Sequence, residues 1–305
     1  MSGRPRRKLF ADARRRSRWN RLTFSSVKSP FESHPRRIII DITAACDLGC
    51  IDCNRSCGKD QAPSSEHMSP DQIRKFVGES LEQDRSWYDE GEPTAVEQNG
   101  IRIRNRELRY EGIRIEGGEP TLHPQLGEVL GILLDYKRHS APSTNLVLCT
   151  NGHGERARRV LKEVPSELEI CDSRKQARVT DLHCAFNMAP VDDRAFEGHD
   201  FSKGCWLPML YGIGLTRHGY YPHPICAGID RVLGLDIGLK KLPPSDHSWT
   251  EHYDRLCRYC GHYNRYAPAG PIRYARPTRE KGKMSPFWQA AYARYQKERP
   301  VLSLY

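Results

Sequence analysis

The sequence predicts an α/β protein in which parallel strands curve into a full or partial (β/α) barrel, followed by a small cysteine-rich extension of hairpin and helix. Short apolar runs alternate with segments of helical periodicity from about residue 36 to residue 200, as in parallel sheets with helices outside. Right-handed crossovers between such strands curl the sheet toward closure. Clustered cysteines after residue 200 indicate the extension.

The first core strand and helix are predicted together with their boundaries. Residues 38–42 are an apolar, mostly β-branched run that predicts a buried strand. Ser69 is the expected N-cap of the next helix, with Pro70 at the first helical position and Gln72 placed for a capping box. The cysteine-rich segment between them is therefore predicted to connect a strand to a helix.

Further strands and helices alternate along the chain. Residues 84–111 fit no strand-to-helix connection, and their alternating run at 101–104 predicts a small hairpin insertion. Strands are predicted at residues 113–115, 146–149, 168–171 and 179–186, with helices near 126–134 and 155–163. The predicted organisation is a flexible basic extension at 1–35, a core at 36–200 containing the 84–111 insertion, a cysteine-rich region at 201–263, and a basic segment at 264–305.

Positive charge is concentrated at the two ends of the chain. Ten Lys/Arg against one Asp give residues 1–28 a charge of +9, and nine Lys/Arg against two Glu give residues 264–305 a charge of +7. Because the whole chain of 305 residues carries +10, residues 29–263 carry −6. An Arg-rich arm is able to bind nucleic acid or an acidic partner, but a solvated, disordered tail is the preferred interpretation.

The composition argues against a membrane or secreted protein. No apolar run approaches the roughly 20 residues of a membrane span, and the basic N-terminus lacks the apolar core of a secretory signal. Eleven cysteines in a chain of this length, without an export signal, do not indicate a secreted disulfide scaffold. The expected compartment is the reducing cytoplasm, where thiols stay free to bind metal.

Three cysteines follow the first predicted strand. Cys46, Cys50 and Cys53 have the spacing C-x3-C-x2-C, at the strand end where α/β folds place active sites. Fully ligated 4Fe–4S clusters use four cysteines, so three thiolates leave one iron open for a ligand. The alternative is a zinc knuckle with Cys57 as its fourth ligand.

A glycine-rich motif follows the second core strand. Gly117 and Gly118 allow the backbone to approach a ligand closely because no Cβ intervenes. Glu119 supplies an acceptor suited to an ammonium group. The alternative is an ordinary glycine turn before a helix that begins at Pro120.

The cysteine spacing resembles the signature of the radical S-adenosylmethionine (SAM) enzymes, in which the open iron binds SAM and an electron from the cluster cleaves it to a deoxyadenosyl radical. The resemblance implies that a GGEP segment binds the SAM amino group and that a polar strand end lies near the ribose. The matching residues are Gly117, Gly118, Glu119 and Pro120 for the first, and Thr150 and Asn151 for the second. Asp52 departs from the pattern, because the family usually has an aromatic residue there against the adenine. For Thr150 and Asn151 the alternative is a common Asn-Gly turn.

Four later cysteines form a second group. One precedes and one follows a predicted hairpin at residues 211–222, and two form a terminal C-x2-C pair. The pattern resembles the twitch extension, a shortened SPASM domain of some radical SAM enzymes, and the resemblance implies an auxiliary 4Fe–4S cluster. A zinc ribbon uses the same four thiolates and is the alternative. The four residues are Cys205, Cys226, Cys257 and Cys260.

A few further residues are candidates for the reaction itself. If Cys184 faces the barrel interior, it is able to donate a hydrogen atom to a substrate radical, although most free cysteines are small buried hydrophobes. Asp41, Glu116 and Asp181 are candidates for binding substrate hydroxyls or taking a proton, and periodicity does not assign their faces.

Together these features predict a radical SAM enzyme that abstracts a hydrogen atom from a small molecule or a peptide. The resemblance implies SAM, a SAM-binding 4Fe–4S cluster, an auxiliary 4Fe–4S cluster and a flavodoxin- or ferredoxin-type electron donor. Oxidation or epimerisation of a sugar or aminoglycoside is preferred, with modification of a ribosomal peptide as the alternative. The alternative function from another class is a zinc-stabilised nucleic-acid-binding protein whose basic ends bind the phosphate backbone.

Overall fold

The computed structural model describes residues 8–9, 36–50, 52–58, 61–89, 96–98, 101–103, 110–175, 186–205, 207–263 and 284–305. Its centre is a seven-stranded sheet in the order β1-β7-β6-β5-β2-β8-β9. All neighbouring pairs are parallel except β8 and β9. The strands are β1 (Lys8–Leu9), β2 (Arg37–Thr43), β5 (Gly112–Gly117), β6 (Asn145–Thr150), β7 (Glu169–Asp172), β8 (Ile213–Thr216) and β9 (Gly219–Tyr221).

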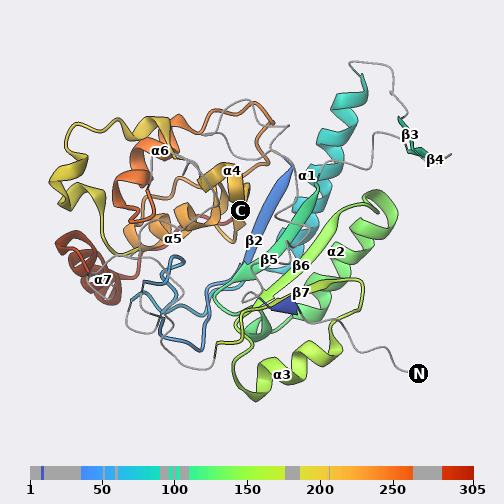
Figure 1. Ribbon diagram of the computed structural model, residues 1–305, viewed down its shortest axis with the longest axis horizontal. Helices are drawn as coiled ribbons and strands as arrows, with labels where there is room; N and C mark the ends of the chain where they lie inside the picture. Colours follow the sequence, from blue (N-terminus) through green and yellow to red (C-terminus); the bar gives the residue numbers. More distant parts are fainter. Residues whose placement is uncertain are drawn as a thin grey trace.

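The helices divide into two groups about this sheet. Figure 1 shows α1, α2 and α3 beside β5, β6 and β7, and α4 to α7 gathered beyond β2. The helices are α1 (Pro70–Asp89), α2 (Leu126–Ser140), α3 (Gly154–Glu163), α4 (Leu207–Tyr211), α5 (Pro224–Leu233), α6 (Thr250–Leu256) and α7 (Pro286–Glu298). No helix in the described ranges is both long enough and apolar enough to cross a bilayer.

The two faces of the sheet differ in chemistry because successive strand residues point to opposite sides. One face joins the main hydrophobic core, to which β2 contributes Ile38, Ile40 and Ile42, packed with residues of α1 and α2. On the other face, Asp41 of β2 is the direct register partner of Glu116 in β5. This second face, called the polar face below, therefore carries charged side chains near the carboxyl ends of the strands.

Helix α1 begins as its sequence predicts. The Gln72 N–H donates to Ser69 Oγ at 3.2 Å, and the Ser69 N–H donates to Gln72 Oε1 at 3.0 Å. This reciprocal pair is a capping box, which satisfies backbone donors that the first turn leaves free. The predicted strand, loop and helix are therefore confirmed for this part of the core.

The sheet is open, because β1 and β9 form its two edges among the described strands. The predicted α/β class with a mostly parallel sheet is confirmed, and the arrangement agrees with a partial barrel rather than a closed one. The strands expected at residues 113–115, 146–149 and 168–171 are β5, β6 and β7. The strand expected at 179–186 lies almost wholly outside the described residues.

Three segments add to the predicted organisation. The hairpin expected in the 84–111 insertion is present as antiparallel β3 (Val96–Gln98) and β4 (Ile101–Ile103). The hairpin expected in the cysteine-rich region is β8 and β9, but β8 pairs with β2 and so extends the core sheet. Within the basic N-terminal extension, Lys8 and Leu9 form the edge strand β1.

Candidate active site

The cysteine loop connects the carboxyl end of β2 to α1. Cys50 is buried, whereas Cys46 and Cys53 are partly exposed. Burial raises the pKa of Cys46 to about 12. The adjacent Cys57 side chain instead lowers the pKa of Cys53 to about 5. Cys57 is 4% exposed and lies beside Cys53 as a neutral thiol.

The GGEP segment at the end of β5 packs directly on this loop. The Gly118 N–H donates to the Thr43 carbonyl at 2.8 Å, and the Glu119 N–H donates to the Ala45 carbonyl at 2.7 Å. A Cβ at Gly118 would lie 2.2 Å from the Ala45 oxygen, and one at Gly117 would lie 2.2 Å from the Thr43 oxygen. The glycines are thus required by close contact with the cysteine loop, whatever ligand they also meet.

Replacing Gly118 by Ala is therefore expected to destabilise the protein by about 1–3 kcal/mol, because a backbone atom must move to admit the methyl group. Gly131 is the matched control. It lies inside α2 with no atom within 4 Å of a built Cβ, so Gly131→Ala is expected to stabilise by about 0.5–1 kcal/mol. Urea unfolding of both variants measures the difference. Equal effects of the two substitutions would contradict this packing.

The Glu119 carboxylate joins three segments inside the protein. Its Oε1 accepts hydrogen bonds from the Thr121 N–H, the Thr121 hydroxyl and the Thr150 hydroxyl at 3.0, 2.7 and 2.8 Å, and its Oε2 accepts from the Asn151 N–H at 2.7 Å. The side chain is 0% exposed, and burial raises the pKa of this carboxyl. Its predicted contact with a ligand ammonium group stays a prediction, while its role in positioning the two strand ends is direct.

Two further contacts join β6 and β7 to the cysteine loop. Asn151 Nδ2 donates to Asp47 Oδ1 at 2.9 Å, and Lys175 Nζ lies 3.8 Å from Cys50 Sγ. The Lys175 N–H also donates to the Asn151 carbonyl at 2.8 Å. The loops that follow β2, β5, β6 and β7 are therefore tied together at the carboxyl edge of the sheet.

A charged network covers the polar face below this edge. Arg55 Nε donates to Asp41 Oδ2 at 2.8 Å, and Arg55 Nη2 donates to Glu116 Oε2 at 2.9 Å. Arg114 Nη2 lies 2.9 Å from Glu116 Oε1 and 3.1 Å from Cys149 Sγ. Burial would raise the pKa of Glu116, but Arg114 and Arg55 hold it below its ordinary value. Asp41 and Glu116, two of the three acidic residues whose faces the sequence left open, therefore lie on the polar face.

The fold brings the four later cysteines together. All four side chains are at most 4% exposed, and they come from the turn before α4, from α5, and from the segment that ends α6. Burial raises the pKa of Cys226, Cys257 and Cys260, and neighbouring thiols of the group raise it further. The residues are Cys205, Cys226, Cys257 and Cys260.

Helix α5 connects this second group to the cysteine loop. Arg231 Nη2 donates to the Ser56 carbonyl at 3.0 Å and to the Arg55 carbonyl at 3.4 Å. A Cβ at Gly228 would lie 3.1 Å from the Arg55 backbone. At the start of the same helix, His223 Nε2 lies 3.6 Å from Cys226 Sγ. One helix thus contacts both cysteine groups.

Helix α7, in the segment expected only to be basic, also forms part of the site wall. The Tyr292 hydroxyl lies 3.0 Å from Ser56 Oγ and donates to Asn187 Oδ1 at 2.8 Å. The Tyr295 hydroxyl accepts from Arg231 Nη1 at 2.7 Å. Sequence reasoning missed these tyrosines, although their spacing of three residues on one helix face was a usable signal.

The local structure explains why position 52 carries an aspartate. Its φ is +59°, in the left-handed region where Asp and Asn are enriched among non-glycine residues. The side chain is 1% exposed, and Asn187 Nδ2 lies 3.4 Å from its Oδ1. The backbone conformation and the buried position thus favour a short polar side chain over an aromatic ring.

Two other expectations concern metal and hydrogen transfer. Cys184 and Asp181 lie outside the described residues. Within those residues, no three His, Cys, Asp or Glu side chains converge closely enough to hold a single metal ion. The cysteines of a 4Fe–4S cluster each bind a different iron, so such a cluster does not require that convergence.

One solved structure, BtrN in complex with AdoMet and 2-DOIA, resembles this chain with a TM-score of 0.42 and 14% sequence identity, over 75% of this chain and 94% of that one. At this identity and score, the likeness does not establish a function for this chain. No protein-family model matches the sequence, and no curated protein matches it significantly.

Proposed function

We propose that this protein is a radical SAM enzyme with an auxiliary iron–sulfur cluster. The observation that carries the proposal is the meeting of three elements at one sheet edge. The C-x3-C-x2-C loop, the GGEP segment and the Thr150–Asn151 strand end are joined by hydrogen bonds through Glu119 and Asp47.

The residues fit the cofactors that this function needs. Cys46, Cys50 and Cys53 would hold a 4Fe–4S cluster with one open iron for SAM, and the backbone around Gly118 would meet the SAM amino group. When reduced, such a cluster supplies the electron that cleaves SAM to the deoxyadenosyl radical. A flavodoxin- or ferredoxin-type protein would supply that electron in turn.

The polar face supports a hydrophilic substrate. Its described side chains include two arginines and two carboxylates in one network. An apolar substrate against this face would remove water from these charged groups without replacing its hydrogen bonds, which is unfavourable. We propose oxidation of a hydroxylated small molecule such as a sugar or aminoglycoside. Because α5 contacts both cysteine groups, we expect an auxiliary cluster held by the later group to take the second electron of the oxidation. Epimerisation and peptide modification, the alternative reactions, would give products that differ from the oxidised small molecule.

Replacing Cys257 and Cys260 together by Ala tests the auxiliary site. The variant is expected to retain roughly four iron atoms, one cluster's worth, and to keep cleaving SAM. Iron analysis and liquid chromatography of deoxyadenosine after anaerobic reconstitution measure both properties. Unchanged iron content in the variant would contradict an auxiliary iron–sulfur cluster. A wild-type protein that contains only one cluster's worth of iron together with zinc would contradict it as well.

A further inference from the structure

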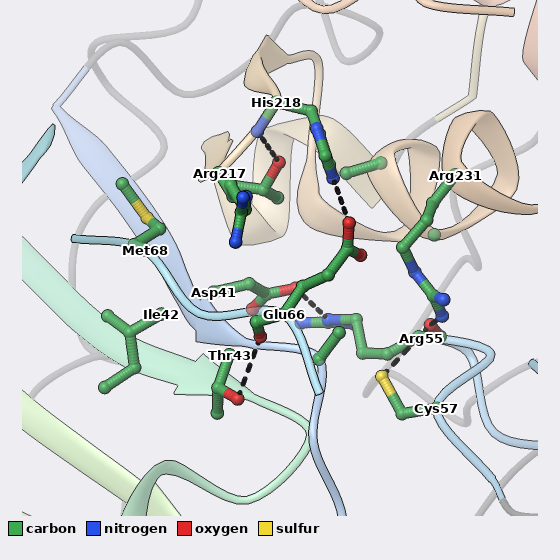
Figure 2. A pocket seen from close by; sticks show the side chains of 14 residues that line it. Asp41, Ile42, Thr43, Arg55, Cys57, Glu66, Met68, Arg217, His218 and Arg231 are labelled. Atoms are coloured by element: carbon green, nitrogen blue, oxygen red, sulfur yellow. Dashed lines mark hydrogen bonds and ion pairs between the residues drawn. The ribbon is translucent and has the colours of Figure 1, made fainter. Parts of the chain in front are cut away.

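A small cavity lies at the carboxyl ends of β2 and β8, against α5. Its volume is about 40 Å³, and a cavity needs roughly 10–15 Å³ of such volume to hold a water molecule. Figure 2 shows Asp41, Glu66 and His218 around it, with Arg55 and Arg231 on the α5 side. Much of its lining is apolar, but several charged side chains reach it, and the cavity is too small for a substrate or cofactor.

Three buried polar atoms at this cavity have no hydrogen-bond partner in the described part of the chain. They are Asp41 Oδ1, Arg217 Nε and His218 Nε2. The other Asp41 oxygen accepts from Arg55 at 2.8 Å. An unpaired buried donor or acceptor costs about 1–3 kcal/mol, so ordered water between these atoms would be stabilised by them.

Asp41 stands between this cavity and the polar face. Its side chain is 10% exposed and is faced by Arg55 from the cysteine loop and by Glu116 from β5, with Cys53 also within electrostatic range. Burial raises the pKa of Asp41 to about 7, although Arg55 opposes the shift. A carboxyl group with such a pKa exchanges protons at neutral pH, as a proton acceptor requires.

The cavity also reaches a pair of groups at its solvent side. Glu66 Oε1 lies 3.4 Å from His218 Nε2, with side-chain exposures of 36% and 7%. The adjacent His218 lowers the pKa of Glu66 to about 2. The 36% exposed Glu66 therefore marks the end of the cavity that meets solvent.

We propose that Asp41 is the proton acceptor of the oxidation, and that water in this cavity carries the proton from Asp41 to the solvent beside Glu66 and His218. This inference rests on the proposed function. After hydrogen-atom abstraction, the substrate's O–H bond breaks and a C=O bond forms at the radical carbon. The proton goes to Asp41, and the remaining unpaired electron goes to the auxiliary iron–sulfur cluster. Asp41 then returns to its ionised form by releasing the proton through the water.

Infrared titration of the purified full-length protein tests the acceptor without requiring SAM cleavage. The expected spectrum contains a carboxyl C=O band that titrates with a midpoint near the pKa of about 7 of Asp41. Asp41→Asn removes that band. Asp71→Asn, at an 87% exposed side chain on α1, leaves it unchanged. A wild-type protein with no carboxyl titrating near neutral pH would overturn the assignment, even if SAM cleavage is normal.

The water path has its own test. Ala227 lines the cavity, and Ala227→Leu would displace its water without changing charge. After a pH jump, this variant is expected to equilibrate the Asp41 band about tenfold more slowly, because the chain of water molecules is interrupted. Ala291→Leu is the matched control, since Ala291 and Ala227 are both 6% exposed and Ala291 lies on α7. An unchanged rate in Ala227→Leu, or a dry cavity in a high-resolution crystal structure, would overturn the path.

Discussion

Replacing Cys46, Cys50 and Cys53 together by Ala is expected to abolish SAM cleavage and to lower the iron content from roughly eight atoms to roughly four. The reason is that these cysteines would hold the only cluster with an iron open to SAM. The four later cysteines lie in a separate buried group, so the auxiliary cluster is expected to remain. Iron analysis and electron paramagnetic resonance of the reduced protein measure the loss.

Cys57→Ala is the control for this prediction. Cys57 is buried beside Cys53 and donates to the Arg55 carbonyl at 3.3 Å, so we expect it to modulate the cluster and not to hold it. The variant should keep its iron and a measurable rate of SAM cleavage. A zinc knuckle requires the opposite result, because Cys57 would be its fourth ligand and its loss would release the metal.

Replacing Glu119 by Ala is expected to lower the free energy of unfolding by about 3–5 kcal/mol, because several buried donors lose their acceptor at about 1–3 kcal/mol each. The affected donors belong to Thr121, Thr150 and Asn151. The same change should disrupt the contact between the GGEP segment and the end of β6, so SAM cleavage is expected to fall as well. Urea unfolding of the protein without added cofactor measures the stability directly.

Glu128→Ala is a matched control for that loss. Glu128 is 43% exposed and pairs with Arg74, itself 52% exposed, and exposed ion pairs contribute at most about 1 kcal/mol. Its replacement is therefore expected to change stability far less than Glu119→Ala. Comparable losses in the two variants would mean that the Glu119 carboxylate does not organise the strand ends.

Local chemistry predicted most of the core elements. The Ser69–Gln72 capping box and the β-branched run at residues 38–42 act over a few residues, so their structural consequences follow from the sequence alone. Strand pairing is different, because it depends on contacts between distant residues. The pairing of β8 with β2 joins Ile38 to Ile213, and no feature of either strand specifies that partner.

The candidate site was predictable at the level of motifs and less so at the level of contacts. Cysteine spacing located both thiol groups, and the glycines located the segment that packs on the loop. The bonding of Glu119 to Thr150 and the contact of Tyr292 with Ser56 were not foreseen. Both depend on how separate elements are placed in space, which short-range periodicity does not encode.

The most direct test of the proposed function is reductive SAM cleavage by the anaerobically reconstituted wild-type protein, measured together with its metal content. The proposal predicts a brown protein with roughly eight iron atoms that forms deoxyadenosine when reduced in the presence of SAM. A colourless protein that contains stoichiometric zinc and leaves SAM intact would contradict it.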